Sequence, residues 1–117
     1  MIEVVNGKQH GFVGENKIYI GRANKSLGLE SSPLANPYKI GADGNRAEVI
    51  ALYRKWLWKK IVVGHNNPNE TFKELFSISH RVNNGEKIQL SCYCKPLDCH
   101  GDVVVKCINW IVSEKLK

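Results

Sequence analysis

The sequence predicts a small α/β domain, a single-domain sandwich of helices on a sheet. Short runs rich in β-branched residues stand near the amino end, two amphipathic helical patterns occupy the middle, and a later strand leads directly into a last helix. The length of 117 residues fits one hydrophobic core, so we expect one domain over residues 1–117. This size excludes a large multidomain enzyme.

The amino-terminal part contains two segments with the composition of strands, residues 1–5 and 12–20. The glycine-containing segment between them, residues 6–11, is short enough for a hairpin. Residues 13–17 interrupt the second segment with polar side chains. The second strand could therefore be limited to residues 18–20.

A long loop and a helix follow these strands. Residues 21–45 contain four glycines, two prolines and no periodicity, and loops of this length in a small domain are usually functional. Residues 46–61 carry an apolar stripe at helical spacing, with Asp43 or Asn45 available as the N-cap. The stripe consists of Val49, Ile50, Tyr53, Trp56, Leu57 and Ile61.

A second helix is predicted over residues 71–82, where Thr71 and Glu74 have the spacing of a capping box. Residues 87–94 then alternate between apolar and polar side chains, which indicates a strand. A turn separates this strand from the last helix, which runs to residue 114. The succession of strand, loop and helix predicts a Rossmann-like crevice at the end of the strand.

The last helix is predicted to begin at Asp98 or Cys99. The apolar residues of its buried stripe are Val103, Val104, Cys107, Ile108, Ile111 and Val112. We assign Cys107 to the hydrophobic core because it belongs to this stripe.

Composition and charge limit the function. Hydrophobic residues make up 43% of the chain, which excludes a disordered protein. Seventeen Lys and Arg against eleven Asp and Glu give a net charge of +6, and this basic balance favours phosphate-bearing partners. The four cysteines all lie in the last quarter and could not tie the rest of the chain by disulfides, which favours a reducing compartment. No apolar segment approaches membrane-spanning length, so we expect a cytoplasmic protein without a membrane partner.

The densest chemistry lies in residues 91–102, SCYCKPLDCHGD, where a strand ends and a helix begins. Helix N-termini at this edge of a sheet attract anions and other ligands. Three interpretations stay open. In the first, a zinc ion or an iron–sulfur cluster is held by Cys92, Cys94, Cys99 and His100, although ordinary zinc sites draw ligands from two separated pairs.

The second interpretation needs no metal or other cofactor. Cys99 is a reactive thiolate at the helix N-terminus, and His100 is its acid or base, so these two residues are the candidate catalytic pair. In the third interpretation the segment is structural. Cys92 and Cys94 pack in the core, and Asp98 caps the helix.

The long loop supplies a second set of candidate binding residues. Gly21 and Arg22 directly follow a strand, where a guanidinium can grip phosphate or carboxylate. Asn36 precedes a proline in a rigid turn. Arg46 stands at a helix start, where a cation opposes the helix dipole and an acidic ligand would compensate it. Neither a P-loop nor a GxGxxG motif is present, so nucleotide binding would need another arrangement.

Four separated segments together resemble the domain of unknown function DUF4326, whose members occur in bacteria and phages. They are YIGR at 19–22, SPLANPYKIG at 32–41, AEVIALYRKWLW at 47–58 and LSCYCKPLDCHGDVV at 90–104. The resemblance spans roughly residues 18–110 and implies no particular reaction. It implies that the positions shared with the family are Gly21, Arg22, Asn36, Pro37, Arg46, Tyr53, Cys92, Cys94, Pro96, Cys99, His100 and Gly101.

These observations predict binding, with or without chemical processing, of a phosphorylated small ligand such as a nucleotide. We expect the ligand-binding residues to be Gly21, Arg22, Asn36, Arg46, Cys94 and Gly101. The alternative is a noncatalytic basic module that binds nucleic acid or a host protein and uses the cysteines and His100 as a structural zinc site. Convergence of Arg22, Arg46 and His100 on one pocket would favour the first hypothesis.

Overall fold

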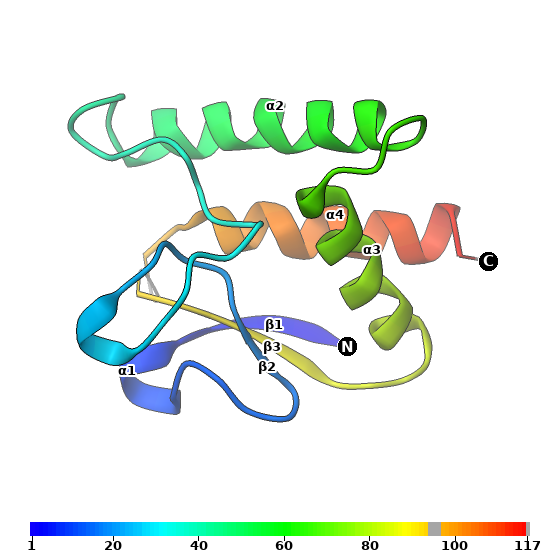
Figure 1. The fold of residues 1–117 in the computed structure, drawn as a ribbon, viewed down its shortest axis with the longest axis horizontal. Helices are drawn as coiled ribbons and strands as arrows, with labels where there is room; N and C mark the ends of the chain where they lie inside the picture. Colours follow the sequence, from blue (N-terminus) through cyan, green and yellow to red (C-terminus); the bar gives the residue numbers. More distant parts are fainter. Residues whose placement is uncertain (94–96, 117) are drawn as a thin grey trace.

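Three parallel strands form the sheet in a computed structural model that describes residues 1–93 and 97–116. In spatial order the strands are β1 (Ile2–Asn6), β3 (Ile88–Cys92) and β2 (Lys17–Tyr19) (Figure 1). Leu90 in the central strand stands opposite Val4 of β1 and Ile18 of β2. The predicted strands are confirmed, and the second is limited to the later part of its segment.

The predicted hairpin between β1 and β2 is wrong, because each of these strands pairs with β3 and not with the other. The chain therefore has to return to the opposite edge of the sheet after β1. A short helix that the sequence did not predict, α1 (Gly7–His10), starts this return, and the Asn6 side chain caps it by accepting the N–H of Lys8 at 2.8 Å. Pairing on both edges satisfies the backbone of the central strand, of which four of the five residues are buried.

The three longer helices are α2 (Arg46–Gly64), α3 (Glu70–Asn83) and α4 (His100–Glu114). Asn45, one of the two predicted N-caps, begins α2 with a capping box. Its side chain accepts the N–H of Glu48 at 2.9 Å, and the Glu48 carboxylate accepts the N–H of Asn45 at 3.0 Å. The helix continues past the predicted end at residue 61.

The predicted capping box of Thr71 and Glu74 is wrong. Helix α3 starts earlier, after Asn69, whose side chain accepts the N–H of Phe72 at 2.8 Å. The Thr71 hydroxyl is buried and donates a hydrogen bond of 2.8 Å to the carbonyl oxygen of Pro33. Thr71 therefore fastens the long loop to α3 instead of capping the helix.

Helix α4 begins after Cys99, so the capping role considered for Asp98 is also wrong. The backbone N–H of Cys99 donates to the Asp102 carboxylate at 3.2 Å, which places an acidic group in the first turn. This geometry puts the Cys99 side chain at the amino end of a helix of 15 residues.

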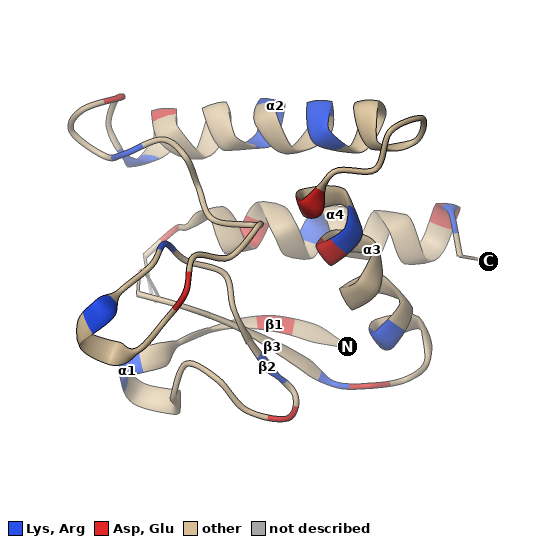
Figure 2. Ribbon diagram, viewed as in Figure 1, with Lys and Arg blue, Asp and Glu red and all other residues tan. Residues whose placement is uncertain are grey.

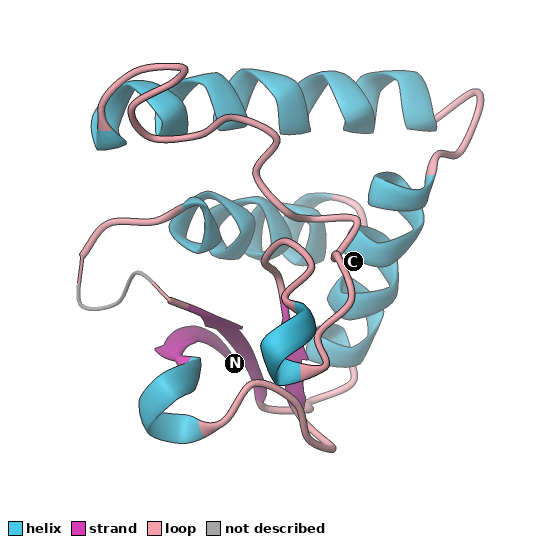
Figure 3. Cartoon of the chain, turned by 60° about the vertical axis from the view of Figure 1, so that its left-hand side comes forward, coloured by secondary structure: helices cyan, strands magenta, loops and turns pink. Residues whose placement is uncertain are grey.

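The helices stack on one side of the sheet. In Figures 1 and 3, α4 lies over the sheet, α3 crosses beside it, and α2 lies beyond α4. One core cluster joins these layers, and its largest fully buried side chains are Ile20, Leu34, Tyr53, Leu57, Ile61, Leu75, Ile78, Ile88, Leu90, Val104, Ile108 and Ile111. Ile20 and Leu34 belong to the segment between β2 and α2, so this long loop is anchored in the core. The Tyr53 hydroxyl reinforces the anchor by donating to the Leu34 carbonyl oxygen at 2.7 Å.

We expect the protein to lose stability in alkali through Cys107. This half-buried side chain packs on the core, and burial raises the pKa of its thiol to about 11. The unfolded chain loses this proton near pH 9, while the folded chain keeps it. The contribution of the protonated thiol to the free energy of unfolding is therefore complete below pH 9 and disappears as the pH rises towards 11. The free energy of unfolding should fall by roughly 1.4 kcal/mol per pH unit in this window.

Urea unfolding at pH 8, 9 and 10 measures this slope. The matched control is Cys107→Ala, which should flatten the curve between pH 9 and 10. Above that range the buried Tyr53 phenol adds its own loss, because burial also raises its pKa. An unchanged slope in Cys107→Ala would contradict the assignment.

Candidate functional site

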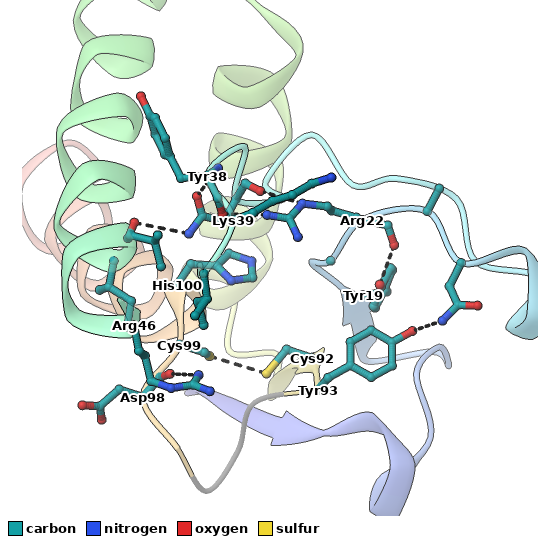
Figure 4. A pocket seen from close by; sticks show the side chains of 17 residues that line it. Tyr19, Arg22, Tyr38, Lys39, Arg46, Cys92, Tyr93, Asp98, Cys99 and His100 are labelled. Carbon is teal, nitrogen blue, oxygen red and sulfur yellow. Dashed lines mark hydrogen bonds between the residues drawn. The ribbon is translucent and has the colours of Figure 1, made fainter. Parts of the chain in front are cut away.

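A cleft of about 460 Å³ opens where the carboxyl ends of β2 and β3 meet the starts of α2 and α4 (Figure 4). The parallel arrangement places these strand ends at one edge of the sheet, where ligands bind in open α/β folds. The lining comes from four stretches of chain: residues 19–24, 36–40, 46–50 and the β3–α4 connection. The predicted crevice between strand, loop and helix is therefore present.

Most of the predicted site residues come together in this cleft. Those that line it are Gly21, Arg22, Asn36, Arg46, Cys99 and His100, together with Cys92. Gly101 does not line it. A Cβ at Gly101 would lie 2.9 Å from Ile20 and 3.0 Å from Val4, so this glycine permits close packing of α4 on the strands. Cys94 lies outside the described residues.

Arg22 braces the long loop from inside the cleft. Its Nε donates to the Asn36 carbonyl oxygen at 3.0 Å, and its Nη2 donates to the Tyr38 carbonyl oxygen at 2.6 Å. Asn36 holds the same turn by accepting the N–H of Tyr38 at 2.9 Å, and its amide donates to the Val49 carbonyl oxygen at 3.4 Å. One guanidinium thus ties the end of β2 to the turn that precedes α2.

Arg46 ties α2 to the other wall of the cleft. Its Nη1 donates to the carbonyl oxygen of Asp98 at 2.9 Å, and Figure 4 shows the Asp98 carboxylate pointing away from His100. Among residues 1–93 and 97–116 the ion pairs are Lys73 with Glu70 and Arg81 with Glu86, outside the cleft.

The cleft carries a net positive charge, because three basic side chains and one carboxylate, that of Asp98, line it. Arg22, Lys39 and Arg46 come from three separate stretches of chain, and no carboxylate within the described ranges forms an ion pair with them. Figure 2 shows further Lys and Arg along α2, so positive charge extends beyond the cleft. An anionic ligand would meet donors that need no rearrangement of existing ion pairs.

Contacts with Ile20 and Tyr53 help to fix the His100 ring. Its Nε2 lies 2.7 Å from the carbonyl oxygen of Ile20, which can only accept, so Nε2 carries the proton. The ring meets Tyr53 edge to face, with centroids 5.0 Å apart. The catalytic role of His100 stays a prediction.

The sulfur atoms of Cys92 and Cys99 lie 3.5 Å apart, and each residue is 2% exposed. Cys92 packs in the core as the structural interpretation required. Within the described part of the chain, no group of three or more His, Cys, Asp and Glu side chains could hold a metal ion. The four-ligand zinc or iron–sulfur site includes Cys94, which falls outside that part, so the metal alternative stays a prediction.

An aromatic wall, which the sequence did not predict, completes the cleft. Tyr19 and Tyr93 line it with ring centroids 6.1 Å apart, and Phe12 packs behind both. The Tyr19 hydroxyl donates to the Arg22 carbonyl oxygen at 2.6 Å, and the Asn24 amide donates to the Tyr93 hydroxyl at 2.9 Å. Burial, followed by the neighbouring Tyr93, raises the pKa of Tyr19, so its hydroxyl stays a donor.

The aromatic wall also explains Gly21. A Cβ at this position would lie 2.3 Å from the Tyr19 hydroxyl. The sequence held one signal for the wall: Tyr19 immediately precedes the Ile-Gly-Arg segment at the end of a strand. Tyr93 gave no comparable signal, because it stands between two cysteines that dominated the interpretation of its segment.

A second concavity, of about 340 Å³, lies between α2 and α4 and is lined mainly by apolar side chains. Trp58 is 53% exposed and meets Trp110 edge to face, with centroids 5.6 Å apart. Arg54 and Lys106 also line this concavity. It is separate from the basic cleft, with which it shares no residue.

In the described parts of the chain, no helix combines the length and apolar character needed to cross a membrane. No curated protein and no solved structure matches the chain. The family model of the domain of unknown function DUF4326 matches residues 5–110. Because this match covers most of the sequence, the chain belongs to the DUF4326 family.

Proposed function

We propose that the protein binds a small phosphorylated ligand, such as a nucleotide, in the cleft at the carboxyl ends of β2 and β3. The observation that carries this proposal is the convergence of Arg22, Lys39 and Arg46 on one cleft, without a carboxylate paired to them in the described residues. Guanidinium groups bind phosphate oxygens through several directed donors.

The size and walls of the cleft support a ligand of nucleotide size. Its volume of about 460 Å³ is within the usual range for small-molecule sites. Two helices of more than one turn begin beside it, α2 at Arg46 and α4 at His100, and helix N-termini attract phosphate. Tyr19, Tyr93 and Ile40 provide apolar surface for a base or another planar group.

Chemical processing, if the ligand is a substrate, would fall to Cys99 and His100. Both line the cleft, and Cys99 stands at the start of α4. A cytoplasmic location suits this proposal, because reducing conditions keep both cleft cysteines as thiols.

Titration calorimetry with adenosine 5′-monophosphate and with adenosine tests the binding proposal. We expect the phosphorylated probe to bind at least tenfold more tightly, and Arg46→Gln to weaken its binding by about tenfold, the effect of one charge-assisted hydrogen bond. Arg54→Gln is the matched control, since Arg54 lies on the same helix outside the cleft. Equal binding of the two probes, or equal losses in both variants, would reject the proposal.

Nucleic-acid binding is the second candidate function. The observation that favours it is the exposed Trp58 beside Trp110, with Arg54 and Lys106 around the same concavity. Aromatic and basic side chains together bind single strands without sequence preference. Binding of an oligonucleotide that weakens steeply with salt and requires Trp58 would favour this function.

A further inference from the structure

The two cysteines in the floor of the cleft are placed for chemistry with each other. Cys92 is the last residue of β3 and Cys99 is the N-cap of α4, and their sulfur atoms lie 3.5 Å apart. A disulfide bond joins sulfurs at about 2.0 Å, so bond formation needs an approach of roughly 1.5 Å. The reduced protein therefore already holds the pair close to bonding distance.

Regular structure holds both partners in place. Cys92 pairs in register with Asn6 of β1, and the backbone N–H of Cys99 is fixed by Asp102 in the first turn of α4. Both cysteines line the basic cleft and are each 2% exposed, so they lie in its floor and a small molecule would reach them from the cleft. Cys107 differs in each respect: it lies along α4, does not line the cleft, and is not in contact with another described cysteine.

The charge around the pair selects the class of reaction partner. Arg22, Lys39 and Arg46 line the same cleft with one carboxylate, Asp98, so its net charge is positive. The amino end of α4 stabilises negative charge on Cys99, and the Asp102 carboxylate in the first turn offsets part of this effect. An anionic small-molecule disulfide would be attracted by these groups, whereas a cationic one would be repelled.

We propose that Cys92 and Cys99 form a thiol–disulfide couple that reduces small anionic disulfides in the cleft. The thiolate of one cysteine attacks a sulfur of the bound disulfide, forms a mixed disulfide and expels the first thiolate product. The second cysteine loses its proton to that product and attacks the mixed disulfide. The Cys92–Cys99 bond forms and the second thiolate product leaves, so two cysteine thiols are oxidised and one disulfide is reduced to two thiols. This activity goes beyond phosphate binding and does not depend on it.

Mass spectrometry of a Cys94→Ser protein tests the couple, because this substitution removes Cys94 as a competing disulfide partner of Cys92 or Cys99. Trypsin leaves residues 88–106 as one fragment, since Lys95 precedes a proline, and this fragment contains both cleft cysteines but not Cys107. After exposure to oxidised glutathione, an anionic disulfide, we expect the fragment to be lighter by two hydrogens and closed to alkylation. Cystamine, a cationic disulfide, should react at least about tenfold more slowly at low salt, when each rate is divided by that of a free model thiol.

The single variants Cys92→Ser and Cys99→Ser, each in the Cys94→Ser background, identify the attacking sulfur. The variant that keeps the attacking cysteine should trap glutathione as a mixed disulfide on it faster than the other variant does. Circular dichroism checks that each variant is folded. If neither double variant folds, the result with the Cys94→Ser protein alone decides the proposal. Full alkylation of both cysteines after oxidation would overturn the proposal. So would pairing with Cys107, or thiols that react only after a chelator has removed bound zinc.

Discussion

Replacing Leu34 with alanine is expected to lower the free energy of unfolding by about 2–5 kcal/mol. Leu34 is 0% exposed although it belongs to the long loop between β2 and α2. Its side chain lies in the same core cluster as Tyr53, and its carbonyl oxygen accepts the hydrogen bond of the buried Tyr53 hydroxyl. The substitution leaves a cavity at the point where the loop is fixed to the helical layers.

Urea unfolding measures this loss, with Leu27→Ala as the matched control. This control is also a leucine-to-alanine substitution in the same loop, but Leu27 is 50% exposed in the short helix η1 (Lys25–Leu27). The control should change stability by less than about 0.5 kcal/mol. Similar losses in the two variants would show that Leu34 is not the anchor.

Replacing Arg22 with alanine is expected to have the largest effect on ligand binding, a loss of about a hundredfold in affinity for adenosine 5′-monophosphate. The change removes a cation from the cleft and also the two hydrogen bonds that hold the turn at Asn36 and Tyr38. The loss of the cation and the loss of the ordered turn, at about 1.5 kcal/mol each, together correspond to this factor. Because both hydrogen bonds lie within the protein, we also expect the free energy of unfolding to fall by about 1–2 kcal/mol.

Two further variants separate these contributions. Arg22→Lys keeps the charge but lacks the two separate guanidinium nitrogens that donate to Asn36 and Tyr38, so its affinity should lie between those of the wild type and Arg22→Ala. Lys25→Ala removes an equal charge from the exposed helix η1 and should bind almost as well as the wild type. Unchanged affinity in Arg22→Ala would remove Arg22 from the binding site.

The helices were predictable because their signals are local. The apolar stripe of α2 and the polar Asn45 before it lie within a few turns of chain, and both had the predicted roles. The start of α3 was predicted wrongly because Asn69 and Thr71 are both good caps, and only the contact of Thr71 with Pro33 removes it from that role. Tertiary contacts decided between two locally acceptable choices.

The site was predictable in its residue types but not in its shape. Arg22, Arg46 and His100 were identified because they stand at strand ends and helix starts, and they do line one cleft. The aromatic wall and the approach of Cys92 to Cys99 depend on which strand occupies the centre of the sheet. Sheet order is set by contacts between residues far apart in sequence, and the hairpin prediction failed for this reason.

The central position of β3 has a consequence for how the protein is made on the ribosome. β1 and β2 are the first strands to be synthesised, but they do not pair with each other, and the strand that joins them begins only at Ile88. Three quarters of the chain must therefore be translated before any strand pair of the sheet can form. Until then the nascent amino-terminal strands expose unpaired edges, and a premature stop before Ile88 would yield a product with no sheet.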